Sequence, residues 1–153
     1  MSIEIACPVS GEVTDLSSVS DPVFAQGIVG PGTAIYPARG GTVVRALAPL
    51  GGRVVTMHPH AFVVESPDGV RVLVHLGIDT VKLRGEGFTP LVSVGDEVRV
   101  GDILIRWDIT AARDAELDLV VPVIVLDIGN REVTPLVWPG TPALEGGPLL
   151  RLS

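Results

Sequence analysis

Cysteine, lysine and aromatic residues are all scarce in this chain of 153 residues. Cys7 is the only cysteine, so an intramolecular disulfide is excluded and a reducing compartment is expected. We predict that Cys7 is an inert, buried side chain of the first strand, because free cysteine usually behaves as a small hydrophobe. Aromatic residues make up only 4% of the chain, so the core must be built mainly from Val, Leu and Ile.

An excess of positive charge and long apolar runs are missing as well. The formal net charge is -7, which argues against a nucleic-acid partner because phosphate recognition normally needs a basic patch. A basic protein partner fits this charge better. No basic segment followed by an apolar stretch opens the chain, and its apolar runs are far shorter than the roughly 20 residues of a membrane span. We therefore expect a soluble cytoplasmic protein without direct membrane insertion.

Turn residues are abundant instead, with 18 Gly and 13 Pro. Short apolar segments lie between these turns, which is typical of an all-β sandwich or barrel, and the length fits one domain over residues 1–153. "SPDG" at 66–69 predicts a tight hairpin turn. The polar, Ala-rich stretch 108–118 predicts the one helix. The clearest strands are expected at 61–66, 69–77, 97–108 and 120–128.

All three histidines of the chain, His58, His60 and His75, fall within 18 residues. Counting back from the "SPDG" turn places residue 60 opposite about residue 75, so the rings of His60 and His75 are predicted to face each other across the hairpin. His58 would share the face of His60 if its strand extends that far, although Pro59 makes regular pairing there doubtful. Two imidazoles that face each other across a hairpin, in an apolar setting, indicate a functional site.

Two chemistries suit this pair of imidazoles. A neutral imidazole is a nucleophile that can accept a phosphoryl group and release it again, while a second imidazole donates a hydrogen bond to that group. Imidazole is also a common zinc ligand, and two or three of them would leave a coordination position open for water. The same residues serve both hypotheses, so the histidines alone leave them open.

A long stretch of the chain resembles a known family. "HAFVVESPDGVRVLVHLGIDTVKLRGEGF" (60–88), followed by "VSVGDEVRVGDILIRWD" (92–108), is similar to the glucose-family IIA component of the bacterial phosphoenolpyruvate-dependent sugar phosphotransferase system. The family's hallmark is a histidine in the setting "VHxGIDTVxLxGEGF". The segments 3–37 and 146–152 resemble the opening and closing strands of that family. The resemblance implies an antiparallel β-sandwich of the barrel-sandwich hybrid type with one or two short helices.

The resemblance also implies a function. His75 would accept a phosphoryl group from the phosphohistidine of the carrier protein HPr and pass it to the IIB domain of a membrane sugar permease, with His60 supporting the onward transfer. Asp79 would help to shape the partner-binding face. An apolar rim would dock the partners, and other proteins would be regulatory targets; no cofactor is implied. The rim residues are Val23, Phe24, Ile28, Val29, Leu73 and Val81.

Three further positions bear on this site. Gly77 could let backbone N–H groups approach a phosphate, whereas turn geometry alone explains Gly85 and Gly87 better. His58 stands where the family commonly has a threonine that orients the second histidine, so the tautomer of His60 is open. Pro22 removes an apolar side chain and a backbone donor from the rim. These departures affect the expected partner affinity more than the chemistry.

Two rival classes remain. A zinc-dependent hydrolase could use His58, His60, His75 and Asp79, because "HPH" and "HLGID" are the ligand pairs of lysostaphin-like peptidases, although their order along the chain is reversed here. A lipoyl or biotinyl carrier is suggested by "VGDEVRVGDIL", but Lys82 is expected in a strand rather than at a hairpin tip. Glucose, N-acetylglucosamine and β-glucoside systems share this family, so the sugar is left open.

Overall fold

Short strands make up most of the regular structure, because turn residues interrupt the apolar segments before they can grow long. The computed structural model describes residues 2–38 and 40–153. Its strands are β1 (Ile3–Ala6), β2 (Gly11–Thr14), β3 (Gly32–Pro37), β4 (Val43–Leu47), β5 (Gly52–His58), β6 (Ala61–Glu65), β7 (Arg71–His75), β8 (Phe88–Pro90), β9 (Glu97–Val98), β10 (Ile103–Asp108), β11 (Val121–Leu126), β12 (Val133–Pro135), β13 (Pro142–Ala143) and β14 (Pro148–Leu152). Its helices are η1 (Leu16–Ser18), α1 (Pro22–Ala25), η2 (Thr80–Leu83) and α2 (Thr110–Asp114), of which η1 and η2 are 3-10 helices.

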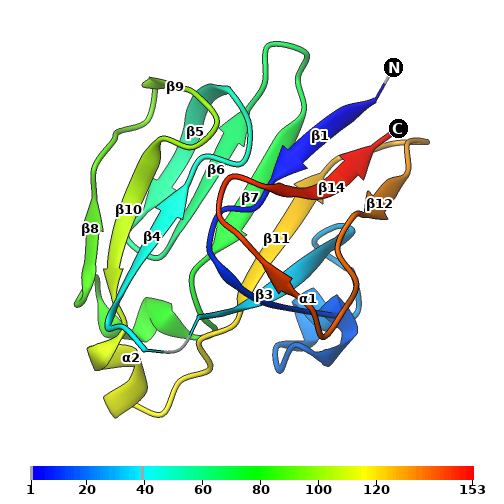
Figure 1. Cartoon of the computed structure of the whole chain (residues 1–153). Helices are drawn as coiled ribbons and strands as arrows, with labels where there is room; N and C mark the ends of the chain where they lie inside the picture. Colours follow the sequence, from blue (N-terminus) through cyan, green and yellow to red (C-terminus); the bar gives the residue numbers. More distant parts are fainter. Residues whose placement is uncertain (1, 39) are drawn as a thin grey trace.

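The strands form three antiparallel sheets. The largest has the order β13-β2-β3-β11-β7-β6-β5-β9, and two three-stranded sheets have the orders β4-β10-β8 and β1-β14-β12 (Figure 1). Every strand pair among the described residues is antiparallel, down to β1 and β14, which bring the two ends of the chain side by side. The predicted antiparallel β-sandwich with one or two short α-helices is therefore confirmed.

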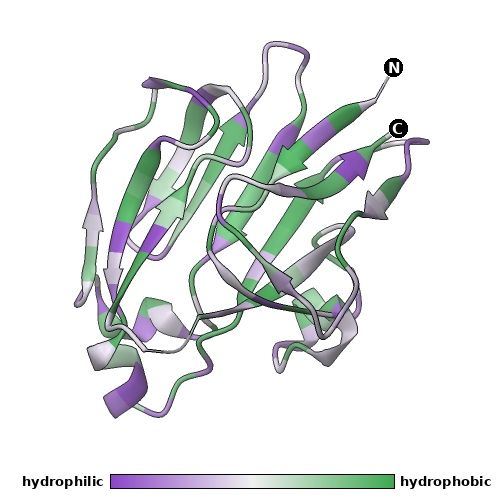
Figure 2. Cartoon of the chain, in the orientation of Figure 1, coloured by the Kyte–Doolittle hydropathy of each residue, from purple (hydrophilic) through white to green (hydrophobic). Residues whose placement is uncertain are grey.

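Two apolar clusters hold the sheets together. The larger lies between the eight-stranded sheet and the two smaller sheets, and it includes the fully buried side chains of Trp107, Phe62 and Leu104. The smaller cluster lies on the other face of the large sheet, where η1 and α1 bring Leu16 and Phe24 onto β3 and β11. Hydrophobic residues predominate along the strands, and hydrophilic residues occur at intervals among them, on α2 and in the loops (Figure 2).

The β6–β7 hairpin has the expected turn. Glu65 pairs with Arg71, the N–H of Gly69 donates to the Ser66 carbonyl at 2.9 Å, and Gly69 has a φ of 86° that favours glycine. Along β7, Val72 and Val74 enter the large cluster whereas Leu73 packs against the small one. Because side chains alternate along a strand, His75 lies on the same face as Leu73, beside the small cluster.

Three predicted elements differ from the structure. The strand expected at 97–108 is divided into β9 and β10 by a turn at Gly101, which has a φ of 89°. The helix expected at 108–118 is only α2, because Glu116 adopts a left-handed conformation and the N–H of Leu117 donates to the Ala112 carbonyl, as in a Schellman motif. Lys82 lies in η2 and not in a strand.

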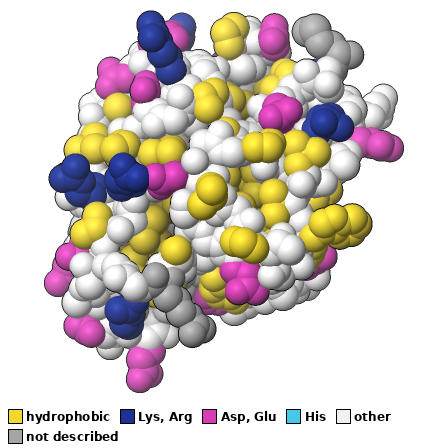
Figure 3. Space-filling model, in the orientation of Figure 1, with side chains coloured by type: hydrophobic (Ala, Val, Ile, Leu, Met, Phe, Trp, Pro, Cys, Tyr) yellow, Lys and Arg dark blue, Asp and Glu magenta, His cyan; other side chains and the backbone are white. Residues whose placement is uncertain are grey.

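One face of the molecule carries many hydrophobic side chains between scattered charges, and no histidine is visible on it (Figure 3). Among the described residues, no helix is long and apolar enough to cross a membrane. Cys7 follows β1 directly, is fully buried and donates its thiol hydrogen to the Val9 carbonyl at 2.9 Å. Burial raises the pKa of this thiol to about 11, as expected of an unreactive cysteine.

Candidate functional site

The three histidines gather at neighbouring strand ends. His58 is the last residue of β5, His75 is the last residue of β7, and His60 lies in the two-residue turn that joins β5 to β6. The ring centroids of His60 and His75 are 5.1 Å apart with planes at 74°, and those of His58 and His60 are 5.7 Å apart with planes at 21°. The expected meeting of these rings is therefore present in the structure.

The register of the hairpin is one residue away from the prediction. His75 pairs with Ala61, and the N–H of Leu76 donates to the His60 carbonyl at 2.7 Å. Strict alternation would turn residue 60 to the opposite face from residue 61. His60 escapes this rule because it lies in the turn after Pro59, outside the extended strand, and its side chain is free to lean toward His75.

A hydrogen bond fixes the tautomer of His75. Its Nδ1 lies 2.6 Å from the carbonyl oxygen of Gly77. A carbonyl oxygen can only accept, so Nδ1 carries the hydrogen and Nε2 keeps the lone pair. Most of the ring is buried, yet Nε2 is not among the buried nitrogen and oxygen atoms that lack a partner, which leaves it open to solvent. The nucleophilic nitrogen of His75 is thus Nε2.

Gly77 can hold this carbonyl in place only as a glycine. Its φ is 80°, and a Cβ at this position would lie 2.6 Å from the Cγ2 of Thr80 and 3.0 Å from the Asp118 carbonyl oxygen. Hydrogen bonds secure both neighbours of Gly77, since the Thr80 hydroxyl donates to the Leu76 carbonyl and the Ile78 N–H donates to Asp118. The role found for Gly77 is therefore that of a carbonyl acceptor for His75, which the sequence did not indicate.

Burial keeps both facing imidazoles neutral near pH 7. Desolvation lowers the pKa of His75, and the opposing effects are its hydrogen bond to Gly77 and the charges of Asp21 and Asp79. The pKa of His60 is lowered to about 4, first by desolvation and then by the charges of His75 and His58. Two neutral rings suit a nucleophile and a hydrogen-bond donor.

Two carboxylates flank His75 electrostatically. Asp79 has a left-handed backbone with a φ of 60°, and its carboxylate lies 3.9 Å from the Nζ of Lys82. Asp21 was not predicted as a site residue; its side chain accepts the N–H of Val23 and begins α1. Pro22 occupies the first turn of that helix, where a missing backbone donor costs little. The Asp-Pro pair was the sequence signal for this helix start.

The predicted rim residues differ widely in exposure. Val23, Ile28 and Val81 are 46%, 67% and 61% exposed. Val29 and Leu73 are half-buried against the smaller cluster. Phe24 is buried, and its ring centroid lies 5.2 Å from that of His75, so it supports the histidine from below instead of standing at the surface.

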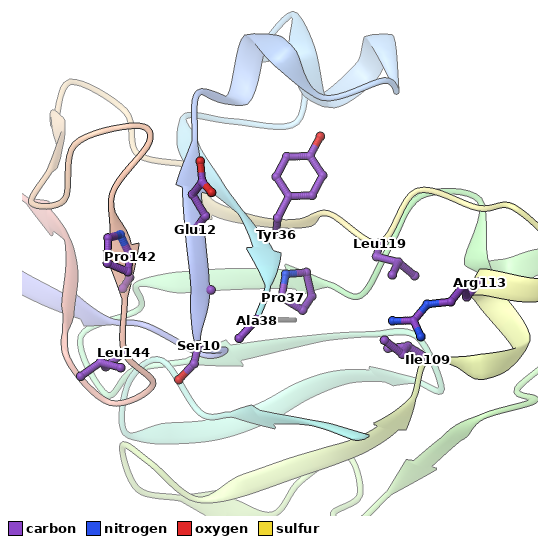
Figure 4. Close-up of a pocket in the computed structure, with 12 residues that line it drawn as sticks. Ser10, Glu12, Tyr36, Pro37, Ala38, Ile109, Arg113, Leu119, Pro142 and Leu144 are labelled. Carbon is purple, nitrogen blue, oxygen red and sulfur yellow. The ribbon is translucent and has the colours of Figure 1, made fainter. Parts of the chain in front are cut away.

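A hollow on the surface lies apart from the histidines. It has a volume of about 820 Å³ and is bordered by the ends of β2, β3 and β13 and by α2 (Figure 4). Tyr36, Arg113 and Leu144 are among the residues that line it, whereas none of the three histidines does so. Nε2 of His75 is open to solvent, which allows another protein to approach it.

The zinc alternative finds no support. Within residues 2–38 and 40–153, no group of three or more His, Cys, Asp or Glu side chains is placed to hold a metal ion. The rings of His58 and His60 are stacked with an offset, and their planes are nearly parallel. Ligands of one tetrahedral metal ion would point their lone pairs at a common centre.

Comparisons with known proteins all point to one family. The family described as phosphoenolpyruvate-dependent sugar phosphotransferase system, EIIA 1, matches residues 3–130. The glucose-specific EIIA component of Oceanobacillus iheyensis is 40% identical over 134 residues, covering 86% of this chain and 79% of the relative. That of Staphylococcus aureus is 41% identical over 125 residues, covering 80% of this chain and 73% of the relative. The solved structure of glucose permease IIA from Mycoplasma capricolum matches with a TM-score of 0.86 and 29% identity, over 99% of this chain and 96% of that one.

Proposed function

The chain belongs to the EIIA 1 family of the phosphoenolpyruvate-dependent sugar phosphotransferase system, and from this premise we propose that His75 carries the phosphoryl group. A phosphocarrier role in that system follows from the family. The donor would be the phosphohistidine of HPr and the acceptor a IIB domain. The single observation that supports His75 most strongly is its free Nε2, with Nδ1 bound to the Gly77 carbonyl.

The transfer step is an exchange between imidazoles. The Nε2 lone pair of His75 forms a bond to phosphorus as the nitrogen–phosphorus bond of the donor breaks, and that electron pair returns to the donor ring. Each ring keeps the hydrogen on its other nitrogen, so no proton has to move. The positive charge that develops on the His75 ring is stabilised by the Gly77 carbonyl and by the carboxylates of Asp21 and Asp79.

His60 would hold the phosphoryl group once it is attached. Its ring lies edge to face with that of His75, and its lowered pKa keeps it neutral, with one N–H to donate. A neutral donor stabilises the phosphoryl oxygens less strongly than a cation would. Such moderate binding suits a group that must be passed on to a IIB domain.

The surface around Nε2 suits a docking partner. Val23, Ile28 and Val81 are exposed apolar side chains, and Asp21 and Asp79 bring negative charge near the same histidine. An apolar patch with acidic neighbours fits a partner whose own patch is apolar with basic neighbours.

The relatives are named glucose-specific, so glucose is the first sugar to test. The cytoplasm is the proposed location.

The decisive experiment is intact-mass measurement after incubation with phosphoenolpyruvate, enzyme I and HPr. We expect the gain of one acid-labile phosphoryl group in the wild-type chain and in His60→Gln, and no gain in His75→Gln. Phosphorus and nitrogen NMR would then identify the modified atom as Nε2. Phosphorylation of His75→Gln, or modification of Nδ1, would contradict the assignment.

A further inference from the structure

His60 is held in a different way from His75. Among the residues that the structure describes, no hydrogen bond reaches either ring nitrogen of His60. Neither nitrogen is among the buried atoms that lack a partner, so both are open to solvent or to an incoming group. Three rings lie near it: His58, His75 and, at a centroid distance of 6.5 Å, Phe88.

The backbone places His58 for this contact. His58 pairs with Ala61 across the two-residue turn, so the strand ends of β5 and β6 fix where the two side chains begin. Pro59 restricts φ inside the turn and reduces the freedom of the link between them. The rings are within 21° of parallel with centroids 5.7 Å apart, which is an offset stack.

A stack and a hydrogen bond constrain an imidazole differently. A hydrogen bond donated to a fixed acceptor selects which nitrogen carries the proton, as the bond to the Gly77 carbonyl does for His75. A stacked neighbour restricts the plane of the ring but makes no distinction between its nitrogens. After desolvation, the groups that lower the pKa of His60 are the other two histidines.

We propose that His58 is a positioning residue that fixes the plane of His60 by ring stacking and leaves its proton free to occupy either nitrogen. This inference rests on the proposed function, because it gives His60 a phosphoryl group to meet. When that group arrives on Nε2 of His75, its oxygens select the tautomer that donates to them. His60 therefore takes up its hydrogen-bonding tautomer only when the phosphoryl group is present.

Nitrogen NMR of the His60 ring in the unphosphorylated protein tests the tautomer directly. We expect both nitrogens to show intermediate shifts, as an exchanging pair of tautomers does, and one tautomer to dominate after phosphorylation. A single tautomer in the free protein would overturn the inference whether or not His75 accepts phosphate. Absence of phosphorylation would contradict the proposed function and leave the free-state spectrum to decide this point.

Three variants at residue 58 test the stack by its effect on transfer. His58 is exposed, so all three should fold. His58→Ala should slow donation to IIB about tenfold, and more than it slows acceptance from HPr, because a free His60 plane loses orientation. His58→Phe keeps a flat ring without a titratable group and should restore most of the rate. His58→Thr should restrict His60 to one tautomer, because the family's threonine at this position orients the second histidine. Equal donation rates in the Ala and Phe variants would refute stacking as the cause.

Discussion

Acidification should destabilise the folded chain through His60. The pKa of this ring is lowered from 6.5 to about 4 on folding, mainly by desolvation. Between these values the unfolded chain binds a proton that the folded chain excludes, so the free energy of unfolding falls as pH falls through this window. Above the unfolded pKa the contribution of His60 is fully present. His75 adds an effect of the same sign, because its pKa is also lowered.

The size of the effect follows from the pKa of His60. The full change corresponds to an upper limit on the order of 3 kcal/mol. Because the ring is only half-buried, solvent screens part of this energy, and we expect a loss of about 1 kcal/mol between pH 7 and pH 5. The shifted carboxylates Asp15 and Asp108 have lowered pKa values, so they titrate below this window and do not obscure it.

Denaturant unfolding of the wild type and His60→Gln at the two pH values measures this term. The urea midpoint of the wild type should fall on acidification, and the variant should lose a smaller amount. The difference between the two chains isolates His60 from groups common to both. A wild-type midpoint that does not change, or an equal fall in both chains, would show that the burial of His60 does not set its protonation.

The other predictions concern the support of His75 and the docking surface. Gly77→Ala should cost about 2 kcal/mol, because it places a Cβ at a φ of 80° against Thr80, and it should shift the His75 nitrogen resonances as the Gly77 carbonyl moves. Unchanged resonances would refute that link. Phe24→Asp should destabilise the chain by about 3 kcal/mol, because Phe24 is buried. Ile28→Asp, at a residue 67% exposed, should keep the unfolding midpoint and weaken HPr binding, and unchanged affinity would place the docking surface elsewhere.

The sequence was most informative where local chemistry dictates structure. "SPDG" predicted the β6–β7 turn because Pro presets φ and Gly can take a positive φ, and that turn brought His60 close to His75. The motif around His75 predicted the family, which the comparisons confirm. The one-residue error in register arose because the β6–β7 loop holds five residues, 66–70, so that Glu65 pairs with Arg71 and not with Val70.

Long-range packing was beyond reach of the sequence alone. Phe24 was predicted at the rim from the family resemblance, but α1 turns it inward onto the small cluster. The hydrogen bond from His75 to the Gly77 carbonyl is local, but the left-handed turn that makes it is also held by the Asp118 carbonyl, which accepts the Ile78 N–H from a distant segment. Neither the packing of Phe24 nor this turn has a periodic signal in the sequence.

The position of Lys82 has a practical consequence for observing partners. Lys82 is the only lysine of the chain, and its side chain is 70% exposed in η2, seven residues after His75. Apart from the terminal amine, an amine-directed fluorophore therefore has one attachment point, beside the exposed Val81. A dye placed there would change its emission when another protein covers the surface around His75. Binding could then be followed by fluorescence without an engineered cysteine for labelling.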